Sequence, residues 1–129
     1  MTRTIVRIHT AILGLAAVAI LVAPGVILAA FNVEAPSFPV LALIRILAGF
    51  ILVLAVAVMP VPDLPIPARG HALTLIALAY CLLAALCIVQ QVAIWSNMAG
   101  ALLTAELILH AAAFVWLAIA ERGSSAVSV

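Results

Sequence analysis

Two charged side chains, Arg45 and Glu106, stand inside long apolar stretches of this 129-residue sequence. Inserting an Arg or a carboxylate at the centre of a membrane-spanning helix raises the free energy of insertion by roughly 2.5–3.5 kcal/mol. Such a residue therefore normally faces a partner. At the rise of an α-helix, Arg45 lies ~7.5 Å and Glu106 ~10 Å from the starts of their stretches. An Arg–carboxylate contact can be bidentate, which sets geometry as well as charge. We therefore expect Arg45 and Glu106 to form an ion pair within the membrane.

More polar side chains are expected at the same level. His110 follows Glu106 by four residues and so shares its helix face, while Gln90 and Gln91 stand near the end of another apolar stretch. With Arg45, these residues form the predicted intramembrane polar cluster. Two roles stay open for this cluster. It is either a structural ion pair whose remaining hydrogen bonds are made by the Gln and His side chains, or the lining of a cavity that opens to the outer side and binds a small molecule or handles protons.

The histidines and cysteines do not indicate a metal or haem site. His9 and His71 fall at the same end of their apolar stretches, but a protein-bound metal usually takes three or four ligands, and no third donor stands at that level. Cys81 and Cys87 lie ~9 Å apart along one helix, too far for a disulfide between them. We expect no cofactor, no metal and no catalytic residue. The enzyme class stays open, with a non-enzymatic role favoured.

Four apolar stretches must position these residues. The chain is 70% hydrophobic and 7% charged, with a mean hydropathy of +1.50, whereas a soluble domain carries about 25% charged residues. A helix needs about 20 apolar residues to cross a bilayer. The stretches that meet this length are approximately 8–31, 40–59, 71–95 and 99–120. The sequence predicts an all-α four-helix transmembrane bundle, a single integral membrane domain over residues 1–129.

The arginines predict the orientation of this bundle. Arg3, Arg7, Arg69 and Arg122 all fall on one side of the four spans, and the positive-inside rule makes that side cytoplasmic. Both termini are therefore expected in the cytoplasm. The first stretch exceeds the ~7–15 apolar residues of a signal peptide, so we expect it to be retained. The formal net charge of +1 offers no basic patch for nucleic acid.

Small residues and prolines predict the packing and one connection. Ala77, Cys81 and Ala85 repeat every four residues, a spacing that lets membrane helices approach closely, either within the bundle or between two copies of the chain. The four prolines of residues 60–67 predict an extended connector, because proline cannot continue a helix.

The layout resembles the DoxX-like class of small bacterial membrane proteins. The resemblance rests on four short helices, on the segment Arg45-Ile-Leu-Ala-Gly49-Phe early in the second, and on Glu106 in the fourth. It spans most of the chain in layout, although its motif is only a few residues long. It implies an accessory or structural subunit of a membrane system in a bacterial inner membrane, and it identifies no catalytic residue here.

The alternative is a small transporter or ligand-binding membrane protein that uses Arg45, Glu106 and His110. Small multidrug exporters of similar length carry their essential Glu in the first helix, where this chain has no acidic residue. This departure disfavours that family. The expected partners are the lipid bilayer and either a second copy of the chain or a larger membrane complex.

Overall fold

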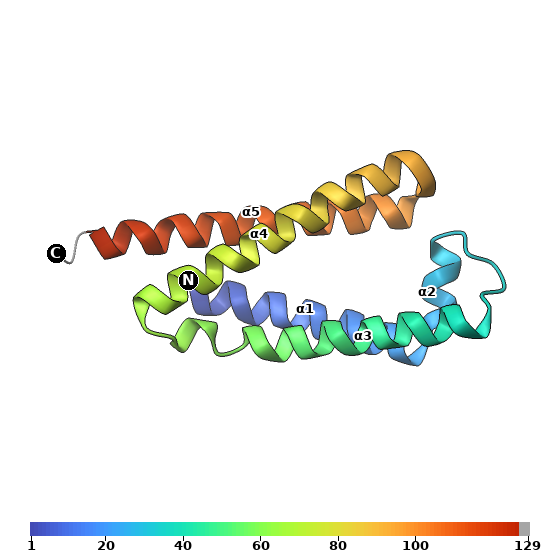
Figure 1. Cartoon of the computed structure of the whole chain (residues 1–129), viewed down its shortest axis with the longest axis horizontal. Coiled ribbons are helices and arrows are strands. Elements are labelled where there is room, and N and C mark those ends of the chain that lie inside the picture. The colour runs from blue at the N-terminus through green and yellow to red at the C-terminus, as the bar shows by residue number, and fades with distance from the viewer. Residues whose placement is uncertain (127–129) are drawn as a thin grey trace. The chain divides into compact units, whose positions relative to one another are not determined.

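The computed structural model describes residues 1–126, apart from the side chains of Ile94, Trp95 and residues 124–126. These described residues form helices and turns, with no β-strand among them. The helical segments are α1 (Thr2–Val22), α2 (Pro24–Ala30), α3 (Phe38–Val58), the 3₁₀ turn η1 (Val61–Asp63), α4 (Ile66–Gln90), the π-helical turn η2 (Gln91–Trp95) and α5 (Met98–Ala126) (Figure 1). The all-α prediction is confirmed.

Four segments are long and apolar enough to cross a membrane. They are Thr2–Val22, Phe38–Asp63, Ile66–Ala93 and Met98–Gly123. Each overlaps one of the predicted apolar stretches. The chain is therefore a small multi-pass integral membrane protein, while the cytoplasmic location of its termini stays a prediction.

The chain folds as two compact units, the first made of Met1 and Arg3–Met59 and the second of Thr2 and the chain from Pro60 onward. In the first unit, the helix predicted over 8–31 is divided at Ala23, whose φ of −132° and ψ of 56° are not helical. Pro24 follows as the first residue of α2. Proline has no N–H to donate and its ring collides with the carbonyl four residues earlier, so the helix stops there. α2 leaves the line of α1, and α3 runs back in the opposite direction (Figure 1).

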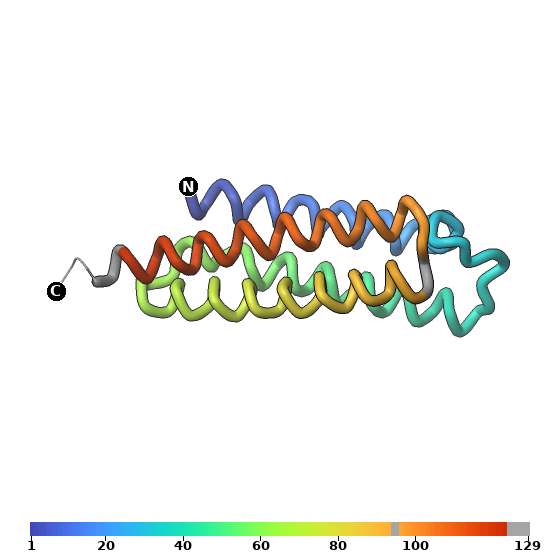
Figure 2. The backbone as a smooth tube through the Cα atoms, turned by 90° about the horizontal axis from the view of Figure 1, so that it is seen from above, coloured from blue at the N-terminus to red at the C-terminus, as the bar shows by residue number. Residues whose placement is uncertain are grey.

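The second unit is an antiparallel hairpin of α4 and α5, which lie side by side in both views (Figures 1 and 2). The buried residues of α4 are Leu73, Ala77, Tyr80 and Ala84. Their separations of four, three and four residues match the contact line, or seam, of two α-helices that pack around each other in a left-handed supercoil. The buried residues of α5 include Gly100, Thr104, Ala111, Phe114, Leu117 and Ala118.

The predicted stripe of small residues is only partly in this seam. Ala77 is buried, but Cys81 and Ala85 are exposed. A helix has about 3.6 residues per turn, so a strict four-residue repeat drifts away from a straight contact line. Tyr80, three residues after Ala77, takes the place in the seam that the stripe assigned to Cys81.

The proline-rich connection differs from the extended connector that was predicted. Val61–Asp63 form a 3₁₀ turn, and α4 already begins at Ile66, with Pro67 in its first turn. Proline is tolerated there because an N–H in the first turn has no acceptor within the helix. The extended prediction was therefore wrong for Val61–Asp63 and for the residues that open α4.

Asn97 caps the turn between α4 and α5. The Gly100 backbone N–H donates to Asn97 Oδ1 over 2.8 Å, which is the bond that an N-cap side chain makes with the third residue of its helix. Gln91 Nε2 donates to the Asn97 carbonyl over 3.0 Å. Ser96 lies between them with a left-handed φ of 44°. These contacts close the hairpin.

Asn97→Ala should lower the free energy of unfolding by about 1 kcal/mol, the usual loss when an N-cap side chain is removed. Asn97→Asp keeps an acceptor oxygen for the Gly100 N–H and should retain most of the stability. Both can be measured by titrating the protein in mixed micelles with sodium dodecyl sulfate and following helix loss. A wild-type midpoint for Asn97→Ala would contradict the capping role.

Candidate intramembrane site

The residues of the predicted polar cluster are divided between the two units. Arg45 lies on α3 of the first unit and is exposed. Glu106 and His110 lie on α5, Gln90 ends α4, and Gln91 begins η2, all in the second unit. Because Arg45 and Glu106 belong to different units, their ion pair stays a prediction.

Within the second unit, Glu106 and His110 are in direct contact. His110 Nδ1 lies 3.0 Å from Glu106 Oε1 and 3.0 Å from the Glu106 carbonyl oxygen. A carbonyl oxygen only accepts, so Nδ1 carries the proton and donates. The His110 side chain is 11% exposed and that of Glu106 35%. The carboxyl group is therefore the more accessible member of the pair.

Tyr80 reaches this pair from α4. Its ring stacks on the His110 imidazole, with centroids 5.3 Å apart and an interplanar angle of 22°. It also stacks on Phe114, with centroids 5.7 Å apart and planes within 1° of parallel. Tyr80 is 8% and Phe114 0% exposed. Stacking of this kind favours one ring orientation, so the two aromatic residues hold the imidazole in place beside Glu106.

Tyr80 was not part of the predicted cluster. Tyr80 lies on a different helix from Glu106 and His110. Which side chains of two packed helices meet depends on how each helix is rotated about its axis, which residue spacing within one helix does not give. The signal that could have found it is on α5, where His110 and Phe114 stand four residues apart and so present two rings on one face.

Gln91 forms a hydrogen bond within the α4–α5 turn and lies away from Glu106. Its Nε2 donates to the Asn97 carbonyl over 3.0 Å, and its Oε1 is buried without a hydrogen-bond partner among the described residues. Asn97 and Glu106 are nine residues apart in sequence, ~13.5 Å along α5. The structure therefore places Gln91 beside the hairpin turn, and it brings together Glu106, His110 and Tyr80 as the candidate site.

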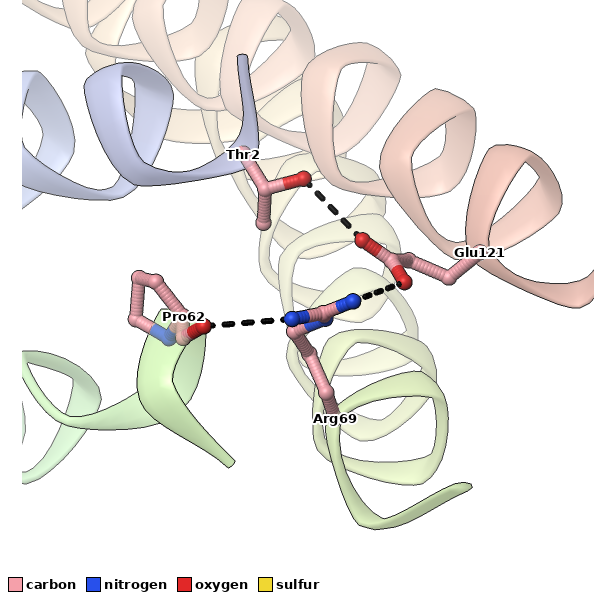
Figure 3. A network of polar contacts seen from close by, with 4 residues as sticks. All are labelled: Thr2, Pro62, Arg69 and Glu121. Carbon is pink, nitrogen blue, oxygen red and sulfur yellow. Dashed lines mark hydrogen bonds and ion pairs between the residues drawn. The ribbon is translucent and has the colours of Figure 1, made fainter. Parts of the chain in front are cut away.

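A second polar group lies where α4 begins and α5 approaches its end (Figure 3). Arg69 Nη2 donates to Glu121 Oε2 over 2.7 Å, and Arg69 Nη1 donates to the Pro62 carbonyl over 3.2 Å. The Thr2 hydroxyl donates to Glu121 Oε1 over 3.1 Å. In the sequence, Arg69 contributes only to the predicted orientation, and Glu121 has no predicted role. Their 52-residue separation leaves no local pattern from which to predict the pair.

The Glu106–His110 pair can hold a proton in two ways. A carboxylate beside an imidazolium and a carboxylic acid beside a neutral imidazole have the same net charge of zero. Both arrangements avoid an uncompensated charge in lipid, which is costly. A proton can therefore move between Glu106 and His110 without changing the net charge of the pair, and the imidazole nitrogen that faces the carboxyl group carries the proton only in the ion-paired form. Among residues 1–126, no group of three or more His, Cys, Asp or Glu residues is placed to hold a metal ion.

No family model matches the sequence, and neither a curated protein nor a solved structure matches it significantly.

Proposed function

We propose that this protein is an accessory subunit of a membrane system, whose intramembrane polar side chains stabilise its own helices. The observation that carries the proposal is that polar side chains of the α4–α5 hairpin bond to neighbours in the same hairpin. Thr74 and Thr104 each donate to the carbonyl four residues earlier over 2.8 Å, and His110 contacts Glu106 within one turn. A transport pathway instead needs such groups to face a water-filled cavity.

The short connections between the spans support the same proposal. Residues 31–37 connect α2 to α3, and residues 59–65 connect α3 to α4 around the short turn η1. These connections are too short for a separate soluble domain, which favours contact with a partner through the helices over contact through the connections. The resemblance to the DoxX-like class also supports an accessory role, and with it a bacterial inner membrane. Cytoplasmic termini are part of the proposal as well, on the distribution of Arg3, Arg7, Arg69 and Arg122.

The test is the mass of the assembly that contains the protein. Tagged protein is solubilised from its native membrane in a mild detergent and separated on a native gel. We expect a species clearly larger than the 13.3-kDa chain or its dimer, with a second membrane protein in fixed ratio. Arg45→Met combined with Glu106→Leu removes both intramembrane charges together and should leave that species intact. Recovery of the chain only as a monomer or homo-oligomer would contradict the proposal.

A second candidate function is proton-coupled binding or transport of a small molecule. The observation that favours it is the 35% exposure of the Glu106 side chain beside an imidazole that is only 11% exposed. An accessible carboxyl group that can exchange a proton with a held partner is the arrangement that intramembrane proton relays use. This function would make Glu106, His110 and Tyr80 the working residues.

Glu106 should then react with a lipid-soluble carbodiimide, which modifies protonated carboxyl groups. Peptide mapping after treatment in native membranes would locate the label, and Glu106→Gln provides the control. Labelling at Glu106 that declines as the pH rises would support proton handling. An unlabelled Glu106 across the pH range would leave only the structural role for this residue.

A further inference from the structure

A groove with a polar head and an apolar tail lies along the α4–α5 hairpin. The head is a cavity of about 340 Å³ lined by Ile66, Pro67, Gly70, His71, Glu121 and Arg122. The tail is a cavity of about 170 Å³, bordered by Thr74 and Arg122 and continued by apolar side chains that include Leu78, Val115 and Ile119. Arg122 lines both cavities, so the head and the tail adjoin at its side chain.

The charges at the head suit an anion. Glu121, the acid that lines it, is paired with Arg69 over 2.7 Å, so these two charges compensate each other. Arg122 is exposed, and its Nη2 donates to Thr74 Oγ1 over 3.2 Å. A hydroxyl partner orients the guanidinium without neutralising it. Among the residues that the structure describes, the positive charge of Arg122 is thus left for a ligand.

His71 adds a second polar group to the head. Its Nδ1 lies 2.8 Å from the Pro67 carbonyl, and because a carbonyl only accepts, Nδ1 is the protonated nitrogen. This bond turns the opposite ring nitrogen, Nε2, away from its own helix. His71 is exposed, so the imidazole and the Arg122 guanidinium both border a cavity that is open to the surroundings.

The length of the groove matches one leaflet of a bilayer. The head lies at the start of the membrane span Ile66–Ala93. From His71 at the head to Cys81 in the tail is ten residues of α4, or ~15 Å, and the hydrocarbon core of a bilayer is ~30 Å thick. An apolar tail of this length beneath a cationic head has the dimensions of a membrane lipid.

We propose that this groove binds a phospholipid with an anionic headgroup, its phosphate against the Arg122 guanidinium, a headgroup hydroxyl donating to His71 Nε2, and one acyl chain along the tail between α4 and α5. Basic pockets between membrane helices are a recurrent site for such headgroups. A free phosphate ester would leave the apolar tail unused, and a zwitterionic lipid would bring its own ammonium group toward Arg122. The groove is lined by residues other than Glu106 and His110, so lipid binding there does not depend on the accessory role.

The headgroup preference is tested by native mass spectrometry of the full-length protein in detergent. The protein is titrated with phosphatidylglycerol or with phosphatidylcholine that has the same acyl chains. One basic residue near an anionic headgroup contributes about 1 kcal/mol, so phosphatidylglycerol should bind about fivefold more tightly. Arg122→Gln should remove that preference. Arg7→Gln, at an exposed arginine of α1, should keep it. Equal affinity of the wild-type protein for the two lipids would overturn the proposal.

The tail is tested with a substitution that fills it. Cys81 is exposed and lines the tail, so Cys81→Trp should weaken phosphatidylglycerol binding by about threefold or more, a modest change in binding free energy. Leu82→Trp, at an adjacent position with 63% exposure, is the control for a bulky ring facing lipid. Unchanged affinity in Cys81→Trp would overturn the proposal. Full displacement of the lipid by glycerol phosphate, which has no acyl chains, would do so as well, because it would identify a site for free phosphate esters.

Discussion

Glu121→Ala should lower the free energy of unfolding by about 2–4 kcal/mol, somewhat less than the loss typical of breaking a fully buried ion pair. The expected loss is smaller than for a fully buried pair because this pair is partly exposed, 23% for the Arg69 side chain and 12% for that of Glu121. The substitution leaves the Arg69 guanidinium half-buried without a counter-charge. It also removes the acceptor of the Thr2 hydroxyl. The pair joins the start of α4 to the last turns of α5 (Figure 3), so we expect this end of the hairpin to open first.

A double-mutant cycle separates the pairing from the loss of each side chain. Arg69→Ala combined with Glu121→Ala should be more stable than the sum of the single losses predicts, by about 1–3 kcal/mol for residues in direct contact. Titration with sodium dodecyl sulfate in mixed micelles measures all four proteins. Glu34→Ala changes an exposed acid outside the helices and should shift stability by less than about 0.5 kcal/mol. Strictly additive losses for Arg69 and Glu121 would show that their contact contributes nothing.

Phe114→Ala should destabilise the protein by about 3 kcal/mol or more, the loss usual for removing a buried aromatic ring. Phe114 is 0% exposed, so its removal leaves a void against α4. Membrane helices associate through close packing, because lipid offers them little hydrophobic gain on association. A void between α4 and α5 therefore removes part of what holds the hairpin together. Phe50→Ala removes a ring on α3 with 65% exposure. It is the matched control and should lower the free energy of unfolding far less.

The same substitution should also disturb the candidate site. Tyr80 stacks on both Phe114 and His110, so loss of the Phe114 ring leaves Tyr80 free to turn away from the imidazole. We expect the His110 ring resonances in NMR spectra of the labelled protein in micelles to shift in Phe114→Ala and to stay in place in Phe50→Ala. His110 resonances that are insensitive to Phe114→Ala would contradict the view that the aromatic stack positions the imidazole.

Composition and periodicity were enough to predict the class of this protein. A chain with 7% charged residues and four long apolar stretches can satisfy its backbone in lipid only by forming helices within each stretch or a closed barrel. The contact between Glu106 and His110 also follows from the sequence, because residues four apart on a helix are neighbours whatever surrounds them. Both results depend on geometry within a single helix.

The contacts between helices depended on information that the linear sequence does not carry. Tyr80 lies in the seam with α5 while Cys81 is exposed, although the four-residue repeat of small residues predicted Cys81 in the contact. Arg69 meets Glu121 across 52 residues, and Arg122 reaches Thr74 across 48. Which residues meet in this way is set by the rotation of each helix about its axis and by the shapes of the side chains that interlock. Local periodicity leaves these open, so the aromatic stack around His110 and the groove beside Arg122 emerged only when α4 and α5 were packed together.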